Sequence, residues 1–169
     1  EMCDSDWSSD VCSSDLLSRK ADYALIALSE LARRLDAQAG PISARELAGQ
    51  FGMPEALLMN VLKDLGKAKL VESTRGVRGG YEMAIEADRV SVVDVVTAVD
   101  GPIRFAACAE GLPIVGQGCQ LAEGCPIRGP VLRLHRQIVD LLESTTVADL
   151  VRDGDALSPE PTMLACTVG

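Results

Sequence analysis

Two short amphipathic segments separated by a glycine turn constrain the fold more than any other feature of this sequence. The first, ISARELAGQFGM, begins with Ser43 as a helix N-cap and Glu46 three residues later, a capping-box pattern, and it ends at Gly52. The second, PEALLMNVLKDL, begins at Pro54 as the first helical residue and repeats leucine and valine at helical spacing. Two short helices across such a turn match helix-turn-helix spacing, in which the second helix reads DNA.

The segments on either side of this pair extend the pattern. A long apolar stripe from Leu17, LSRKADYALIALSELARRLDA, predicts a first helix that stops before Gly40 and Pro41. After the pair, LVESTRGVRGGYEMA reads as two strands around a glycine-rich tip that carries two arginines. Arginines on such a tip can enter a minor groove, so the hairpin is interpreted as a wing. We expect these side chains to contact DNA: Arg19, Lys20, Ser43, Glu55, Asn60, Lys63, Arg75 and Arg78.

Charge is distributed unevenly along the 169 residues, which carry a net charge of −9. Residues 1–18 hold five acids and no base, residues 19–89 hold eleven bases and ten acids, and residues 90–169 hold five bases and ten acids. An acidic chain argues against general nucleic-acid affinity but allows a local basic edge. Because no apolar run is long enough to cross a bilayer, we expect a cytoplasmic protein with no membrane partner.

The chain divides into four parts by composition. Residues 1–16 are acidic and rich in serine and aspartate, and Asp6 to Asp15 back-translate to a string like a sequencing-library adapter. They are therefore interpreted as an artefact or a disordered tail. Residues 17–89 are expected to form the winged helix-turn-helix domain. Residues 90–150 are expected to hold a cysteine loop and dimerisation helices, and residues 151–169 a disordered tail.

Three cysteines lie in a loop of small residues with the spacing C-x10-C-x5-C. They are Cys108, Cys119 and Cys125, whereas Cys3, Cys12 and Cys166 fall in the two tails. Thiolates are soft donors that suit iron–sulfur clusters or zinc, and reduced clustered cysteines favour such chemistry over structural disulfides. A closed site needs four ligands, so this set is one ligand short. The sole histidine, His135, is one candidate for the fourth.

An apolar repeat after Pro130 predicts a long helix with an unpartnered seam. Val131, Leu134, Ile138 and Leu141 recur at alternating steps of three and four residues. Such a seam favours a homodimer, and packing against the helix's own domain is the alternative.

These motifs together resemble the Rrf-type bacterial transcriptional regulators, which include the iron–sulfur regulator IscR, the nitric-oxide sensor NsrR and the regulators of the SUF cluster-assembly operon. The resemblance rests on LSRKADYALIAL, the helix pair, STRGVRGGYEMA, VSVVDVVTAVDGPI and the three cysteines, and it runs from Leu17 to about Leu150. DGPI and CPIRG make the SUF regulators the most similar. The resemblance implies a mainly α fold with a small β-wing, a long dimerisation helix, and a homodimer that binds a double-stranded DNA operator.

The resemblance also bears on the missing ligand. IscR-like members place a histidine three residues after the third cysteine, but this chain has Arg128 there, which cannot ligate as a cation. Similarity to NsrR implies that Asp22, near the start of the first helix, ligates across the dimer. A second departure is Lys69, which stands where relatives commonly have glycine. Lys69 either adds a phosphate-directed charge or strains a turn that needs positive φ.

The resulting hypothesis is a regulator, not an enzyme. Its DNA binding would report iron–sulfur cluster status or redox and nitrosative stress through a two-iron or four-iron cluster, and would control cluster-assembly genes. A zinc-stabilised regulator and a metal-free thiol-redox regulator remain alternatives. No phosphate loop, zinc-hydrolase motif or paired catalytic carboxylates are present in the sequence, which argues against catalysis.

Overall fold

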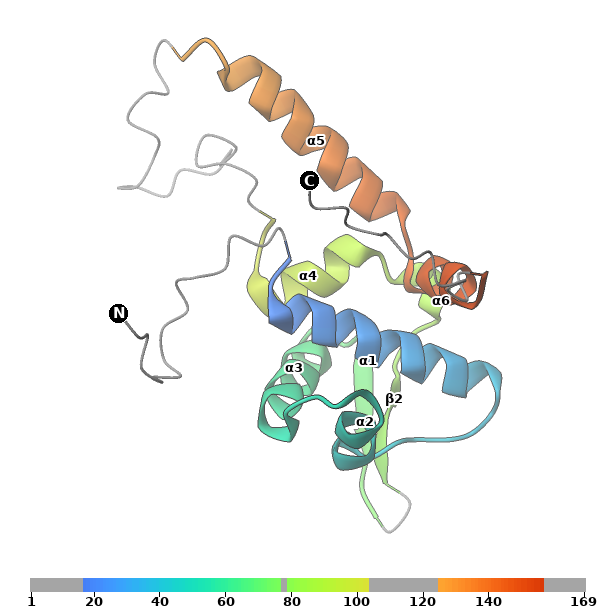
Figure 1. Cartoon of the computed structure of the whole chain (residues 1–169). Coiled ribbons are helices and arrows are strands. Elements are labelled where there is room, and N and C mark those ends of the chain that lie inside the picture. The colour runs from blue at the N-terminus through green and yellow to red at the C-terminus, as the bar shows by residue number, and fades with distance from the viewer. Residues whose placement is uncertain (1–16, 77–78, 104–124, 157–169) are drawn as a thin grey trace, which may run out of the picture.

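Helix α1 lies at the centre of the molecule. The computed structural model describes residues 17–76, 79–103 and 125–156. Their elements are α1 (Arg19–Asp36), α2 (Ala44–Phe51), α3 (Glu55–Lys67), β1 (Val71–Thr74), β2 (Gly80–Met83), the 3-10 helix η1 (Ala87–Arg89), α4 (Val92–Asp100), α5 (Arg128–Ser144) and α6 (Val147–Ala156). Strand β2 and helices α3, α4 and α6 all pack against α1, and Figure 1 shows α2 and α3 below it and α4 above. The mainly α fold with a small wing is therefore confirmed.

Small and branched side chains allow this close packing. Ala24, Ala27 and Leu28 of α1 are fully buried, and they meet Leu58 and Leu62 of α3 in one continuous core. Alanine on the inner face of α1 lets neighbouring helices approach closely. Each fully buried leucine contributes roughly 1.5–3 kcal/mol of transfer free energy to folding.

Serine caps fix where the first two helices begin. Ser18 caps α1 by accepting hydrogen bonds from the backbone N–H groups of Lys20 and Ala21, at 3.1 and 3.2 Å. Ser43 caps α2 and accepts from the Glu46 N–H at 3.1 Å, as its motif predicts. Pro54 differs slightly from expectation, because it is the N-cap residue of α3 and the helix begins at Glu55.

Two helices end on side chains in the left-handed backbone region. Gln38 follows α1 with φ of 52°, and Lys69 follows α3 with φ of 60°. At each end two backbone hydrogen bonds close the last turn; after α3 they run from Lys69 N to Gly66 O and from Leu70 N to Leu65 O. This is the Schellman arrangement, in which glycine is the usual residue. Of the two outcomes open for Lys69, the structure shows the strained turn.

The hairpin is joined to the segment between α1 and α2. Strands β1 and β2 pair antiparallel, with Val71 opposite Met83 and Thr74 opposite Gly80. Ile42 then bridges to Tyr81 through two backbone hydrogen bonds of 3.1 and 2.8 Å. A Cβ at Gly80 would lie 2.5 Å from the backbone of Ile42, so this close approach requires glycine. An isolated β-bridge therefore ties the two-stranded wing to the linker before α2.

Helix α6 corrects the expected boundary of the C-terminal tail. Residues 151–156 belong to this helix, and Val147 and Val151 are buried in the core that α1 and α3 form. A capping box begins the helix. The backbone N–H and the hydroxyl of Thr146 donate to the Asp149 carboxylate, at 2.9 and 2.6 Å. The Thr146 hydroxyl oxygen in turn accepts from the Asp149 backbone N–H. Polar and glycine-rich composition concealed this helix, whose apolar side chains are few but buried. Residues 157–169 lie outside the described residues, as do residues 1–16.

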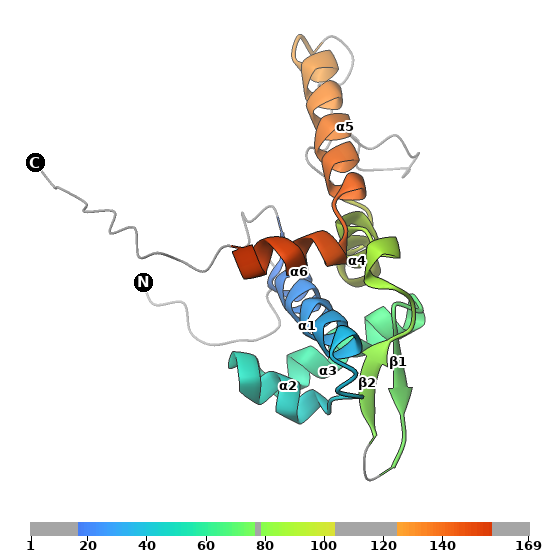
Figure 2. The same cartoon turned by 90° about the vertical axis from the view of Figure 1, so that its right-hand side faces the viewer.

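Helix α5 projects away from the rest of the molecule. Both views show it leaving the body on the side opposite the hairpin tip (Figures 1 and 2). None of its side chains is buried, and Leu134 and Leu141 are 44% and 64% exposed. Its C-terminal end is anchored, where Leu142 packs against the cluster of Ala21, Val92 and Val96. Across the described ranges, no helix is long and apolar enough to cross a membrane.

Candidate DNA interface and cysteine site

The outward face of α3 carries three of the residues expected to contact DNA. Glu55, Asn60 and Lys63 are exposed. The opposite face of the same helix is buried through Leu58, Val61, Leu62 and Leu65. Since one face is fixed in the core, the polar face is presented to solvent in a defined orientation.

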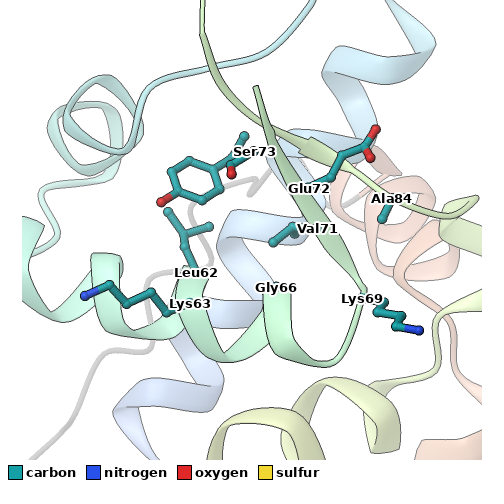
Figure 3. Close-up of a pocket in the computed structure, with 9 residues that line it drawn as sticks. Leu62, Lys63, Gly66, Lys69, Val71, Glu72, Ser73 and Ala84 are labelled. Carbon is teal, nitrogen blue, oxygen red and sulfur yellow. The ribbon is translucent and has the colours of Figure 1, made fainter. Parts of the chain in front are cut away.

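A groove separates α3 from the hairpin. Its cavity of about 590 Å³ is lined by Leu62, Lys63, Gly66, Lys69, Val71, Glu72, Ser73, Tyr81 and Ala84. Figure 3 shows the Lys63 and Lys69 side chains extending toward opposite ends of this groove. A helix in a major groove and a wing in the adjacent minor groove must straddle the sugar–phosphate strand between them. The groove lies between the helix and the hairpin that the sequence predicts to be the reading helix and the wing.

The other predicted DNA contacts are dispersed over the molecule. Arg75 is exposed beyond the end of β1, and Arg78 lies outside the described residues. Ser43 is half-buried and its hydroxyl oxygen accepts from the Glu46 backbone, so its first role is to begin α2. Arg19 and Lys20 are exposed in the first turn of α1, which both views place away from the hairpin tip (Figures 1 and 2).

Of the three loop cysteines, Cys125 alone lies within the described residues. It is a half-buried free thiol three residues before α5, and its carbonyl oxygen accepts from the Arg128 N–H at 3.3 Å. Cys108 and Cys119 lie outside the description. Within residues 17–76, 79–103 and 125–156, no group of three histidine, cysteine or acidic side chains is placed to hold a metal ion. The donor chemistry of Cys125 fits a soft metal centre, and the rest of that site is not described.

Asp22 and Cys125 are far apart in one chain. Leu142 packs beside Ala21, the neighbour of Asp22, whereas Arg128 lies fourteen residues earlier in α5, about 21 Å along the helix axis. Figures 1 and 2 both show that end of α5 pointing away from α1. Metal–ligand bonds are only about 2.0–2.3 Å long. Asp22 is therefore not positioned to share a metal with Cys125 of its own chain.

His135, the other candidate ligand, lies within α5 and not at its N-terminal end. Its Nδ1 atom is buried and is the only such side-chain nitrogen or oxygen of the described residues without a hydrogen-bond partner. His135 is seven residues after Arg128, about 10 Å along the helix from the end nearest Cys125. The structure does not bring the two together.

The helix pair, the wing and the projecting helix define a winged helix-turn-helix protein. The chain belongs to the Rrf2 family, described as iron-dependent transcriptional regulators, whose model matches residues 17–153. It is thus a transcriptional regulator of a DNA-binding family and not an enzyme.

Individual relatives agree with this assignment. The chain is 33% identical over 137 residues to a helix-turn-helix-type transcriptional regulator of Synechocystis sp., covering 81% of this chain and 88% of the relative. It is 32% identical over 141 residues to the transcriptional regulator IscR of Erwinia tasmaniensis, covering 83% and 81%.

Solved structures show the same fold. CymR of B. subtilis, the global cysteine regulator, superposes with a TM-score of 0.64 at 28% identity and covers 81% of this chain and 96% of its own. T. potens IscR superposes with a TM-score of 0.66 at 26% identity, covering 85% and 90%. Solved structures named IscR and CymR thus share the fold of this chain.

A contact that the sequence analysis missed joins α1 to α4. The Ser18 hydroxyl donates to Asp100 Oδ2 at 2.5 Å, across 82 residues of sequence. Ser18 could have been recognised as an N-cap from its position before the first helix. Its pairing with Asp100 depends on how two helices pack, and no local sequence signal reports that.

Proposed function

We propose that this chain is a homodimeric regulator whose operator affinity follows the state of an iron–sulfur site built on Cys108, Cys119 and Cys125. The observation that carries the proposal is the position of Cys125 three residues before α5, on whose surface Leu134 and Leu141 are exposed. A metal ligand and a dimer surface then lie on one element. The iron-dependent description of the family and the three-cysteine spacing support the same assignment.

The fourth ligand in this proposal is Asp22 of the partner subunit. Asp22 is exposed in the first turn of α1, and the end of α5 nearest Cys125 points away from α1 in both views (Figures 1 and 2). A second copy of the chain supplies the carboxylate without requiring α5 to fold back. When bound, the cluster would supply a redox-active and oxidant-sensitive iron centre between the subunits.

In the DNA complex, the polar face of α3 enters the major groove and the hairpin enters the adjacent minor groove. Asn60 and Glu55, exposed on this face, would meet base edges, and Lys63 would meet the phosphate strand in the groove beside it. Arg75 and Arg78, the two arginines of the hairpin segment, would contact the minor groove. Arg19 and Lys20 would contact backbone phosphates at the edge of the site. The proposed target genes are those of cluster assembly, by resemblance to the SUF regulators.

Metal analysis tests the cofactor. Protein purified without oxygen is expected to absorb visible light and to contain iron and sulfide, and Cys125→Ser should lose both. Cys166→Ser, outside the proposed ligand set, is the matched control and should keep them. A colourless wild-type protein with stoichiometric zinc would contradict the iron–sulfur site. A metal-free protein whose thiols oxidise reversibly would contradict it in favour of thiol chemistry.

Salt dependence tests the DNA interface. Removing one phosphate or groove contact weakens binding and lowers the slope of log affinity against log salt by about 1. We expect this of Arg75→Ala and Lys63→Ala. Arg136→Ala removes a cation from α5, on the projecting side of the molecule, and should leave the slope unchanged. If all three variants keep the wild-type slope, α3 and the wing are not part of the interface.

A further inference from the structure

One row of side chains on α3 is turned toward the hairpin. The Tyr81 hydroxyl of β2 donates to the Met59 sulfur at 3.9 Å. Lys63 and Gly66 line the groove between the two elements (Figure 3). Because Met59, Lys63 and Gly66 are spaced by four and three residues, they form one row along the helix. In the proposed complex, this row faces the phosphate strand along most of its length.

A second row lies further from the hairpin and opposite the core. Ala56, Asn60 and Lys67 are exposed, and they are spaced by four and seven residues. With 3.6 residues per turn, these positions lie within about 40° of one another around the helix axis. They are opposite the face that Leu58 and Leu65 bury. In the proposed complex, this second row is the part of α3 that points into the major groove.

The chemistry of the second row points to particular base pairs. Its first half carries the methyl group of Ala56 and the carboxamide of Asn60, and no cation precedes Lys63 on α3. The N-terminal residues of a reading helix contact base edges. Guanine is read most often by arginine or lysine, whereas asparagine pairs with N6 and N7 of adenine. Glu55 suits cytosine, but it lies four residues before Met59 and so begins the first row. The second row is therefore suited to A·T base pairs.

Ala56 supplies an apolar contact in the first turn of this helix. The C5-methyl group of thymine is the apolar group on the base edges of the major groove, and alanine is one of the side chains that contact it. Since alanine has no rotamers, the backbone of α3 sets the position of its methyl group, and binding immobilises no side chain. Ala56 and Asn60 are about 6 Å apart along the axis. Base pairs stack about 3.4 Å apart, so the two contacts fall within two base-pair steps.

We propose that Ala56 and Asn60 make each half of the operator selective for two A·T base pairs within two steps of each other. Asn60 hydrogen-bonds adenine N6 and N7, and the Ala56 methyl group packs against the C5-methyl group of thymine. This inference rests on the proposed DNA interface of α3 and adds the bases that the interface selects.

Exchange of thymine for uracil tests the Ala56 contact, because uracil lacks only the C5-methyl group. A duplex selected by the protein from random DNA provides the operator, and each thymine is then replaced in turn in both half-sites. At one position, uracil should weaken binding by about fourfold per half-site, the value of one buried methyl group. In Ala56→Gly, the ratio of dissociation constants at that position should fall to within about twofold of unity. A general loss of affinity caused by glycine in α3 cancels in this ratio.

Two further variants control for other sources of the uracil effect. Ala68→Gly removes an exposed methyl group at the C-cap of the same helix and should keep the wild-type ratio. Phe51→Ala removes the aromatic ring that ends α2 and is 39% exposed, and it should also keep that ratio. A uracil effect that persists in Ala56→Gly and disappears in Phe51→Ala would assign the thymine to α2 and contradict the role of Ala56.

Exchange of adenine for 7-deazaadenine tests the Asn60 contact, because the analogue lacks the N7 acceptor. At one adenine this exchange should weaken wild-type binding by at least about fivefold per half-site, and it should not weaken binding of Asn60→Ala further. The adenine identified in this way should lie within two base-pair steps of the thymine identified with uracil. A larger separation, or G·C pairs at both positions of the selected operator, would overturn the inference.

The outcomes separate this inference from the interface on which it rests. If Lys63→Ala keeps the wild-type salt slope and no base exchange depends on a residue of α3, the proposed interface itself fails. If Lys63→Ala lowers the slope but wild type, Ala56→Gly and Asn60→Ala respond alike to both exchanges, only the base assignment is wrong. Loss of each effect in its own variant alone supports the assignment.

Discussion

Lys69 occupies a backbone conformation that side chains with a Cβ usually avoid. Its φ of 60° closes the Schellman turn between α3 and β1, where the Leu70 N–H must reach the Leu65 carbonyl. A left-handed residue other than glycine costs about 1–2 kcal/mol. At this position the strained residue is a lysine, whose ammonium group lies at the rim of the groove beside α3.

Lys69→Gly should therefore raise the free energy of unfolding by about 1 kcal/mol, because relief of backbone strain exceeds the added entropy of glycine in the unfolded chain. Chemical denaturation measures this free energy of unfolding, and the same measurement with DNA present shows whether the lysine ammonium contributes to the complex. Gln38→Gly, at the equivalent position after α1, should give a similar gain. If Lys69→Gly destabilises the protein while Gln38→Gly stabilises it, the lysine side chain makes a contribution that strain does not explain.

At the scale of elements, helix N-caps account for much of what could and could not be predicted. The Ser43 cap, the glycine turn and the alternating strands gave α2, α3 and the hairpin, since each is encoded within a few neighbouring residues. Helix α6 has an equally local signal in Thr146 and Asp149, but its second half, from Val151, was interpreted as part of a tail. What makes α6 part of the fold is the burial of Val147 and Val151 against distant helices.

Asp149 gives α6 a specific pH dependence. The Thr146 hydroxyl, then its backbone N–H, donate to Asp149, and together with Arg152 they hold the pKa of this carboxyl below its ordinary value of 3.8. A lowered pKa in the folded state contributes stability above pH 3.8 that is lost as the pH falls through the folded value.

Asp149→Asn should accordingly lower the free energy of unfolding at neutral pH, and its difference from wild type should shrink as the solution is acidified below pH 3.8. Denaturation curves at several pH values measure this difference. Asp153→Asn, on the same helix and exposed, is the control and should show a smaller effect at neutral pH. A difference that stays constant with pH would exclude the Asp149 carboxylate as its source.

At the scale of the whole molecule, α5 is stabilised by little of its own chain. Leu134 and Leu141 lie seven residues apart on its surface and are largely exposed. The sequence repeat predicted this seam, and the alternative, packing of the helix on its own domain, holds at the end near Leu142. Val131 and Ile138 are half-buried, so the exposed part of the seam is Leu134 and Leu141, and these two are the residues that a second copy would cover.

A charged double substitution tests that seam. In Leu134→Asp/Leu141→Asp, a dimer would bury unpaired charges at about 3–5 kcal/mol, so the dissociation constant should rise by at least about 100-fold. Analytical ultracentrifugation measures it. Arg136→Asp, on the outer face of α5, should leave association nearly unchanged. A monomeric wild-type protein, or a double variant that associates normally, would exclude α5 as the dimer surface.

Mixed dimers test whether the ligands come from different subunits. If Asp22 ligates across the dimer, a heterodimer of Asp22→Ala and Cys125→Ser chains retains one complete site. It should then bind about half the iron of wild type. If each site uses one chain only, both sites are defective and the heterodimer binds almost none. Each homodimeric variant, isolated in the same way, provides the baseline.

The candidate sites were only partly predictable for a physical reason. Residue types and spacing identify thiol donors and basic tips, because ligand chemistry is local. The distance between Asp22 and Cys125, and the contact between Ser18 and Asp100, follow from how α1, α4 and α5 pack. Such distances depend on the buried faces of several helices at once, which a pattern within one helix does not encode.

The backbone bridge between Ile42 and Tyr81 has a consequence for operator choice. Because the wing is hydrogen-bonded to the linker that enters α2, its angle to α3 is fixed by the backbone and closely fitted at Gly80. An operator whose adjacent grooves do not match that angle must itself bend or change groove width. Because the DNA must deform, binding costs less free energy at operators with flexible base-pair steps. Such steps would then be selected even where the protein makes no contact with the bases.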